Sequence, residues 1–249
     1  MTGNDTARDT KIAWIAGVGA LQGTGAAVAQ RFAKEGFTAV VTGRSPERLA
    51  DVVRAIEQAG GSALAAPGDV TSERDQLDIL ARIESLGTLE VAVYNAGNSR
   101  WAPTLELDSA TFEQSWRVCC FGGFIFGREV IRSMQKRGRG TVLFTGATAS
   151  LRGRPRFAAF SAAKAGLRMV SQTLAREFQP QGIHVAHVVI DGGIRGERFV
   201  SKQPEAATKM DADSLLDIDA IADAYWYLHR QHRSAWTQEL DVRPYSESF

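Results

Sequence analysis

The clearest chemical signal in this sequence is a cluster of four glycines at 17–25. A short apolar run at 12–16 precedes the cluster and has the length of a buried parallel strand, while residues 26–33 are apolar at helical spacing. A strand, a glycine turn and a helix favour a bound phosphate, because the backbone can approach it and the helix N-terminus offers free N–H groups. The alternative is a glycine-rich turn without a ligand.

A second signal is Arg44, which follows the predicted strand at 38–42. In a dinucleotide fold the residue about 20 positions past the glycine turn meets the adenosine ribose, where an acid suits NAD and an arginine suits the 2′-phosphate of NADP. No carboxylate occurs here before Glu47. Arg44 therefore favours NADP(H) over NAD(H), and the alternative is a solvent-facing arginine beside a helix that Ser45 caps.

Two further polar residues stand at the ends of predicted strands. Asp69 is interpreted either as a partner for an adenine amino group or as the cap of a helix that begins near Ser72. Asn95 opens the segment Asn95-Ala96-Gly97, in which small residues let the chain pass close beside a cofactor. The Asn95 amide is expected to tie neighbouring strands together.

Strand-like and helix-like segments alternate to the end of the chain, which predicts one α/β domain with a doubly wound parallel sheet and helices on both faces. About seven strands are expected, at 12–16, 38–42, 62–66, 89–94, 141–145, 183–190 and 238–242. Ligands bind beyond the carboxyl ends of such strands, so the loops after the first, fourth, fifth and sixth strands should share a cleft.

Two segments depart from this regular pattern. Residues 195–219 form a long polar connection, and a connection of that length inside a domain is most often a lid over a pocket. Three glycines, Gly122, Gly123 and Gly127, lower the helix propensity of the long helix predicted at 109–138. Close helix packing, as at a contact between subunits, is the expected reason for them.

The composition is that of a soluble globular protein, with 249 residues, 44% hydrophobic and 23% charged. The 29 basic and 28 acidic side chains nearly balance, and no basic block points to nucleic acid or a membrane as a partner. Residues 1–10 are expected to be a flexible tail before a domain at 11–249. The two cysteines, Cys119 and Cys120, are adjacent, which gives no sign of an oxidising compartment and favours the cytoplasm. No metal-ligand cluster is expected.

Together these features resemble the short-chain dehydrogenase/reductase family over essentially the whole chain. Segment 19–25 resembles its G-x-x-x-G-x-G loop, 69–70 its adenine-site motif, 95–97 its N-A-G motif, and the helix carrying Lys164 its Y-x-x-x-K helix. The resemblance implies a single Rossmann-like domain, a homodimer or homotetramer, and hydride transfer between a nicotinamide and a carbonyl or alcohol. It implies cofactor contacts from Gly19, Leu21, Gln22, Gly23, Thr24, Arg44, Asp69, Val70, Asn95, Ala96, Gly97, Lys164 and Ile194.

The sequence departs from the family at the residues that handle protons. Phe160 stands in the place of the family's catalytic tyrosine, Ala147 in that of its serine, and Cys119 in that of its asparagine, so that only Lys164 remains. Phenylalanine has no proton to give. General acid–base assistance is worth about 10²–10⁴-fold and one oxyanion donor roughly 10²–10³-fold, so a carbonyl reductase without both should be slow.

Thr148 and Asp191 are the candidate replacements, and they complete a predicted catalytic set with Lys164. Thr148 is one step from the missing serine, and Asp191 follows the sixth strand, where a simple turn residue is the alternative. Cys119 is interpreted as a small buried hydrophobe rather than a reactive thiol. The arginines at 152–156 would receive an anionic substrate or form an ordinary solvated loop, and the loop is favoured.

The favoured function is an NADP-dependent oxidoreductase with a non-standard proton relay, which reduces a C=C, C=O or C=N bond of a small organic substrate. The alternative is a cofactor-binding protein with little or no catalysis, acting as a sensor or partner subunit. A non-redox lyase is disfavoured, because it would have little reason to keep both Arg44 and the glycine turn.

Overall fold

The computed structural model describes residues 10–202, 204–205 and 212–247. Seven strands pair in parallel in the order β3-β2-β1-β4-β5-β6-β9. They are β1 (Lys11–Ala16), β2 (Thr38–Thr42), β3 (Ser62–Ala65), β4 (Thr88–Tyr94), β5 (Gly140–Thr145), β6 (Ile183–Ile190) and β9 (Glu239–Val242). The predicted fold class, a doubly wound parallel sheet, is confirmed.

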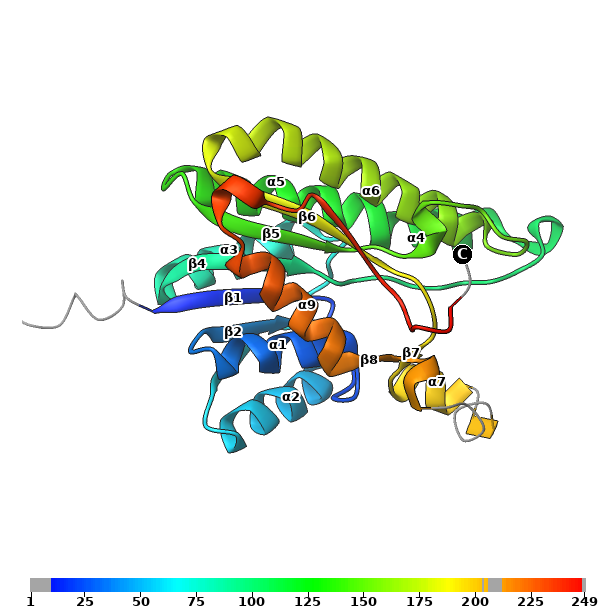
Figure 1. Cartoon of the computed structure of the whole chain (residues 1–249), viewed down its shortest axis with the longest axis horizontal. Helices are drawn as coiled ribbons and strands as arrows, with labels where there is room; N and C mark the ends of the chain where they lie inside the picture. Colours follow the sequence, from blue (N-terminus) through cyan, green and yellow to red (C-terminus); the bar gives the residue numbers. More distant parts are fainter. Residues whose placement is uncertain (1–9, 203, 206–211, 248–249) are drawn as a thin grey trace, which may run out of the picture.

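The helices cover both faces of this sheet, as Figure 1 shows for α4, α5 and α6 on one side and α1, α2 and α9 on the other. The first side carries α4 (Ser109–Trp116), α5 (Gly122–Gln135) and α6 (Ala158–Phe178), and α3 (Glu73–Leu86) lies on the same side. The second comprises α1 (Thr24–Lys34), α2 (Pro46–Gln58) and α9 (Ile218–Arg230). Because successive strand residues point to opposite faces, each face has its own apolar core. Along β1, Ala13 and Ile15 belong to one core and Ile12 and Trp14 to the other.

The carboxyl ends of the strands meet at one edge of the molecule. There a small helix, α7 (Glu197–Lys202), lies beside a separate strand pair, β7 (Ile194–Arg195) and β8 (Leu216–Asp217), within the predicted lid. Residues 203 and 206–211 of that predicted lid lie outside the described residues. The strand order reverses between β1 and β4, and this is the place where doubly wound sheets bind ligands.

The long helix predicted at 109–138 is continuous, but it has a feature that the sequence did not predict. A π-helical turn, Arg117–Phe121, joins α4 to α5. Its glycines are closely packed, as expected, and their described neighbours lie within this chain. A contact with another subunit stays a prediction. A Cβ on Gly122 would lie 2.4 Å from Tyr94 Oη, and one on Gly123 would lie 2.4 Å from Leu167 Cδ1.

The chain ends add little to this architecture. Of the predicted tail at 1–10, residues 1–9 lie outside the described residues, and the carbonyl oxygen of Thr10 accepts a hydrogen bond from the Thr88 N–H at 2.8 Å. Within the described ranges, no helix is both long enough and apolar enough to cross a membrane.

Candidate active site

The loops after β1 and β4 touch through their backbones. Gly17 has φ of 97°, and a Cβ there would lie only 2.2 Å from the backbone nitrogen of Ala96. The N–H groups of Gly17 and Val18 both donate to the Thr42 carbonyl, at 2.9 and 2.8 Å. Only glycine allows this approach, because a side chain would both clash and strain the left-handed backbone.

Asn95 links three segments, as the sequence predicts. Its Nδ2 donates to the Gly17 carbonyl at 2.9 Å, and its Oδ1 accepts from Thr145 Oγ1 at 3.1 Å. Since the single hydroxyl proton of Thr145 is used there, Tyr225 must donate its own proton to Thr145 Oγ1, 2.6 Å away. Burial raises the pKa of Tyr225. Sequence reasoning missed Tyr225, which is 80 positions from Thr145 and belongs to no motif.

The glycine turn leaves room and donors for a pyrophosphate. A Cβ on Gly19 would meet nothing within 4 Å among the described residues. Gly23 is the N-cap of α1 and no side chain caps this helix, so the N–H groups of its first turn remain available. The side chains of Leu21 and Ile194 pack against the apolar core, so their backbones would be the groups that face a ligand. The residues present therefore fit a dinucleotide.

Arg44 lies beside this turn because Gly43 packs against it. A Cβ on Gly43 would come within 2.1 Å of the Val18 carbonyl oxygen. Arg44 is exposed, and its side chain has no hydrogen bond or ion pair within the described part of the chain. The nearest carboxylate along the sequence, Glu47, accepts the Ser45 hydroxyl at 2.8 Å. As predicted, Ser45 also caps α2, through the Arg48 N–H.

Asp69 lies in the loop after β3, next to Val70, but it does not cap the following helix. Its Oδ1 accepts the backbone N–H and the hydroxyl of Thr71, both at 2.8 Å. The cap of α3 is Ser72, whose Oγ accepts the Asp75 N–H at 3.2 Å. The capping interpretation of Asp69 is therefore wrong, and a contact with adenine stays a prediction.

Lys164 is buried where the loops after β4 and β5 meet. Its ammonium donates to the Thr145 carbonyl at 2.7 Å, and the side chain lies beside Gly97, where a Cβ would be 3.3 Å from Nζ. Burial lowers the pKa of this ammonium below its usual value, with Cys119 acting in the opposite direction. The ring of Phe160 is next to it, with its centroid 6.0 Å from Nζ.

Cys119 lies on the π-helical turn close to Lys164. It is fully buried, as predicted, and its thiol forms a weak hydrogen bond of 3.9 Å with Asn98 Oδ1. Asn98, directly after the N-A-G segment, is a second polar residue that sequence reasoning missed.

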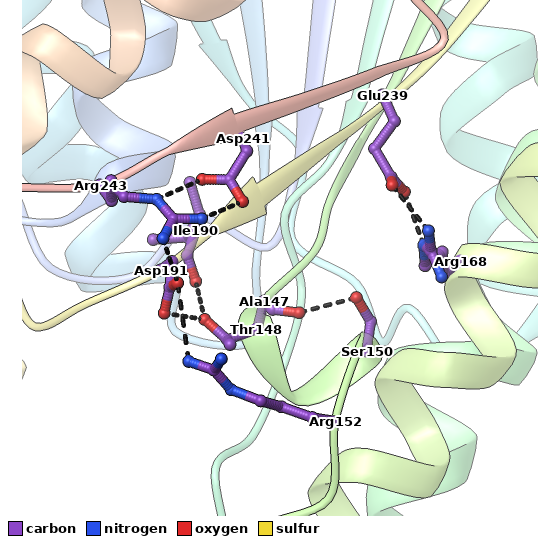
Figure 2. Close-up of polar contacts among 10 residues, drawn as sticks. All are labelled: Ala147, Thr148, Ser150, Arg152, Arg168, Ile190, Asp191, Glu239, Asp241 and Arg243. Carbon is purple, nitrogen blue, oxygen red and sulfur yellow. Dashed lines mark hydrogen bonds and ion pairs between the residues drawn. The ribbon is translucent and has the colours of Figure 1, made fainter. Parts of the chain in front are cut away.

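Thr148 and Asp191, proposed separately from the sequence, form one polar cluster, shown in Figure 2. The Thr148 hydroxyl donates to Asp191 Oδ1, and Asp191 Oδ2 lies 3.3 Å from Arg243 Nη1 and 4.0 Å from Arg152 Nη2. Asp191 is 3% exposed. Arg243 is held in turn by the Asp241 carboxylate, at 3.0 and 2.6 Å. No sequence spacing pointed to Arg243, which approaches from beyond the last strand.

A separate buried network lies on the α6 side of β6. His187 Nδ1 lies 3.0 Å from Glu239 Oε2. Arg168 donates to both Glu239 oxygens at 2.7 Å, and Figure 2 shows this ion pair. Burial lowers the pKa of His187 to about 4, although Glu239 opposes this shift. The ring is therefore neutral near pH 7, and Nδ1 must carry the proton, because a carboxylate only accepts. A Cβ on Gly146 would overlap Nε2, at 2.2 Å.

Helix α7 bridges the two sides of the strand ends. The Glu197 N–H donates to the Gln22 carbonyl in the glycine turn at 2.8 Å, and its carboxylate lies 3.4 Å from Arg48. Arg198 reaches the other side and donates to Ser99 Oγ at 3.0 Å. The described part of the predicted lid thus links the loops after β1 and β4.

The arrangement can cradle a dinucleotide with backbone groups and place a buried ammonium and a threonine–aspartate pair at the adjoining strand ends. A family model described as short chain dehydrogenase matches residues 11–204. The chain belongs to this family. It is therefore an oxidoreductase of the short-chain dehydrogenase/reductase type.

Named relatives of this short-chain dehydrogenase are themselves dehydrogenases. It is 32% identical to 3β-hydroxysteroid dehydrogenase 1 of Eggerthella lenta over 208 residues, which cover 81% of this chain and 79% of that one. It is 33% identical to glucose 1-dehydrogenase of Gluconobacter oxydans over 179 residues, 71% and 67% of the two chains.

Solved structures agree with the fold. A crystal structure of a short-chain dehydrogenase from Rhodopseudomonas palustris is 39% identical, with a TM-score of 0.81 over 96% of this chain and 100% of the other. A 7α-hydroxysteroid dehydrogenase in complex with NADH and 7-oxo glycochenodeoxycholic acid is 27% identical, with a TM-score of 0.84 over 98% of each chain.

Proposed function

We propose that this enzyme is an NADP(H)-dependent oxidoreductase that reduces a C=C, C=O or C=N bond of a small organic substrate through a non-standard proton relay. The observation that carries the coenzyme assignment is the exposed Arg44, which stands beside the glycine turn without a carboxylate partner among the described residues. A guanidinium in that position suits a 2′-phosphate, whereas the hydroxyls of NAD would need an acceptor.

The cofactor would lie across the loops after β1 and β4. Gly19, Gln22, Gly23 and Thr24 would offer backbone groups to the pyrophosphate, together with Leu21. The remaining contacts in this proposal come from Asp69, Val70, Asn95, Ala96, Gly97, Lys164 and Ile194. When bound, NADPH would supply a hydride from its nicotinamide ring.

In the proposed relay, the Thr148 hydroxyl is the group nearest the substrate and Asp191 is the residue behind it. Because Thr148 donates its proton to Asp191, an oxygen lone pair stays free to accept a proton from a substrate alcohol. In the reducing direction the proton moves the other way, from a transiently protonated Asp191 through Thr148 to the substrate. Lys164 would favour negative charge developing nearby, since its ammonium is buried without a carboxylate partner among the described residues.

One observation favours the second candidate, a cofactor-binding protein with little catalysis. Phe160 occupies the space next to Lys164 with a ring that cannot donate a proton, and the Thr148 proton is already bonded to Asp191. A protein built in this way would bind the dinucleotide tightly and turn over slowly.

The coenzyme assignment is tested by titrating the protein with NADPH and with NADH, using tryptophan fluorescence. Arg44→Gln should weaken NADPH binding about 10- to 100-fold, the worth of hydrogen bonds to a charged group, and leave NADH binding unchanged. The matched control is Arg54→Gln, which removes an exposed arginine of α2 that pairs with Asp51. Equal NADPH affinity in wild type and Arg44→Gln would refute the assignment.

The two candidate functions are separated by NADPH oxidation with a panel of ketones, enones and imines. Turnover with any of these classes supports the oxidoreductase with a relay. Tight NADPH binding with no oxidation across the panel would support the binding protein instead.

We also propose that the enzyme works as a cytoplasmic homodimer or homotetramer. Trp116 on α4 and Phe124 on α5 are each about 40% exposed, and exposed large apolar side chains favour a contact surface. Both cysteines are free and buried, which suits a reducing compartment. Light scattering during gel filtration tests the assembly, and a monomer at micromolar concentration would contradict it.

A further inference from the structure

A row of aromatic rings leads from the surface to the buried Lys164. Trp101 stacks on Phe157, with ring centroids 5.3 Å apart and an interplanar angle of 21°. Phe157 lies 6.4 Å from Phe160, whose centroid is 6.0 Å from Lys164 Nζ. The row therefore connects a ring that is 53% exposed with a lysine that is 4% exposed.

The two loops that carry the outer rings are joined by their backbones. The Ala102 N–H donates to the Arg156 carbonyl at 3.1 Å, and the Phe157 N–H donates to the Arg154 carbonyl at 3.1 Å. Arg156 has φ of 71°, the only positive φ of a non-glycine residue in the described ranges. Left-handed backbone is unfavourable for arginine and persists where its surroundings fix it, often at functional sites.

The open side of the row has room for a small ring. A hollow of about 280 Å³ adjoins it, lined by Thr104, Leu107, Ser109, Phe112 and Ala158. Pockets for drug-sized ligands are roughly 300–1,000 Å³, so this hollow suits a single ring with a short side chain. The exposed indole of Trp101 and the ring of Phe112 give that ring apolar surface to cover.

The rim of this surface is positively charged. Arg100, Arg154 and Arg156 are all exposed, and none of their side chains bonds or pairs with another residue of the described ranges. Of the two carboxylates in the adjoining segment, Asp108 accepts the Thr111 N–H and hydroxyl, while the Glu106 side chain has no hydrogen bond or ion pair among the described residues. The arginines thus outnumber the acids, and free guanidinium groups favour a carboxylate, which they can bind with two hydrogen bonds.

We propose that the aromatic row and its arginine rim bind a small aromatic carboxylate at the entrance to the active site. The ring covers Trp101 and lies toward Phe112, and the carboxylate faces Arg154 and Arg156 at the outer end of the row. This inference rests on the proposed function, because it concerns the same active site.

The test is calorimetric titration of the full-length protein with cinnamate and with cinnamamide, in the presence of NADP⁺ so that no hydride is available. The two probes share a ring and an alkene and differ in charge. Cinnamate should bind at least about fivefold more tightly, since two exposed arginines each contribute a modest ion pair. The double variant Arg154→Gln/Arg156→Gln should remove this preference and leave cinnamamide binding unchanged.

Trp101→Ala should weaken the binding of both probes about five- to tenfold, which is the typical contribution of one aromatic contact. Its matched control is Tyr227→Ala, which removes another exposed aromatic side chain, on α9. Arg74→Gln is the control for charge, because its side chain is 90% exposed and lies on α3.

Equal affinity for cinnamate and cinnamamide, or no binding of either, would overturn the inference. A preference that survives the double arginine variant would overturn it as well. The proposed function fails separately, if NADPH itself does not bind. The acid-to-amide ratio is therefore also measured without NADP⁺, where it reports on the arginine rim alone.

Discussion

The β1–β4 side of the strand ends and the β5–β6 side hold their functional groups in different ways. On the first side, backbone meets backbone: Gly17 against Ala96, and Gly43 against Val18. On the second side, the groups that matter are side chains, such as the pair Thr148 and Asp191.

This difference gives a physical reason for our proposal that one side keeps the family's pattern while the other departs from it. A backbone cradle depends on a few positions where no side chain fits. A substitution at any one of these positions would therefore disrupt the whole cradle. A proton relay depends on single side chains, and these can be replaced while the fold around them stays intact. In this proposal, Phe160 and Ala147 stand in such replaced positions.

The largest expected effect comes from disrupting the backbone contacts on the β1–β4 side. Gly17→Val should destabilise the protein by at least about 3 kcal/mol, because a side chain there meets Ala96 and Asn95 and the left-handed backbone is strained. The melting temperature should fall by about 6–12 °C, as measured by calorimetry. Gly19→Ala is the matched control, since a Cβ at Gly19 meets nothing and stability should not change. Equal loss in both variants would show that the close approach is not the cause.

The next largest effect is the dependence of the protein's stability on pH, which tests the side chains around His187 on the β5–β6 side. Burial lowers the pKa of His187 to about 4, whereas a histidine in the unfolded chain titrates near 6.5. The unfolded state therefore takes up the proton first, and stability falls as the pH drops from about 6.5 to about 4. For His187 the full loss is on the order of 3 kcal/mol.

His187→Gln keeps a donor for Glu239 but cannot become charged, so it should lose less stability than wild type between pH 7 and pH 4.5. Urea unfolding at both values measures this difference. His232→Gln, which changes an exposed histidine, should behave as wild type. If the stability of the His187 variant depended on pH as that of the wild type does, His187 would not be the source of the acid sensitivity.

A smaller effect tests the proposed relay. Thr148→Val should lower kcat for NADPH-dependent reduction about 10- to 100-fold, because the hydroxyl between Asp191 and the substrate is lost. Thr148→Ser should restore most of the rate, and the affinity for NADPH should be unchanged in both. Thr173→Val, at an exposed position of α6, is the control. Full activity in Thr148→Val would remove Thr148 from the relay.

Much of the fold could be predicted from the sequence, because local patterns specify it. Apolar runs such as 12–16 and 183–190 gave the strands, and the order of strands and helices gave the parallel sheet. The glycine turn and the link made by Asn95 were also predictable, since they rely on residues near strand ends. The Ser45 cap followed from its residue type and position.

The rest could not be predicted, because it depends on contacts between distant residues. Tyr225 reaches Thr145 across 80 positions, and Arg243 reaches Asp191 from beyond the last strand. The glycines of the long helix indicated tight packing, but the sequence did not show which residues they pack against. Asp69 was ambiguous because aspartate serves equally well in turns and at helix caps.

The most direct test of this proposal is to introduce a proton donor at the positions that it regards as replaced, and to measure turnover and binding together. The double variant Ala147→Ser/Phe160→Tyr should raise kcat for a ketone by about tenfold or more, because a general acid and a hydrogen-bond donor return. Its affinity for NADPH should stay that of wild type, since the backbone cradle is untouched. An unchanged kcat, or a loss of NADPH binding, would contradict the account of an intact cradle beside a replaced proton donor.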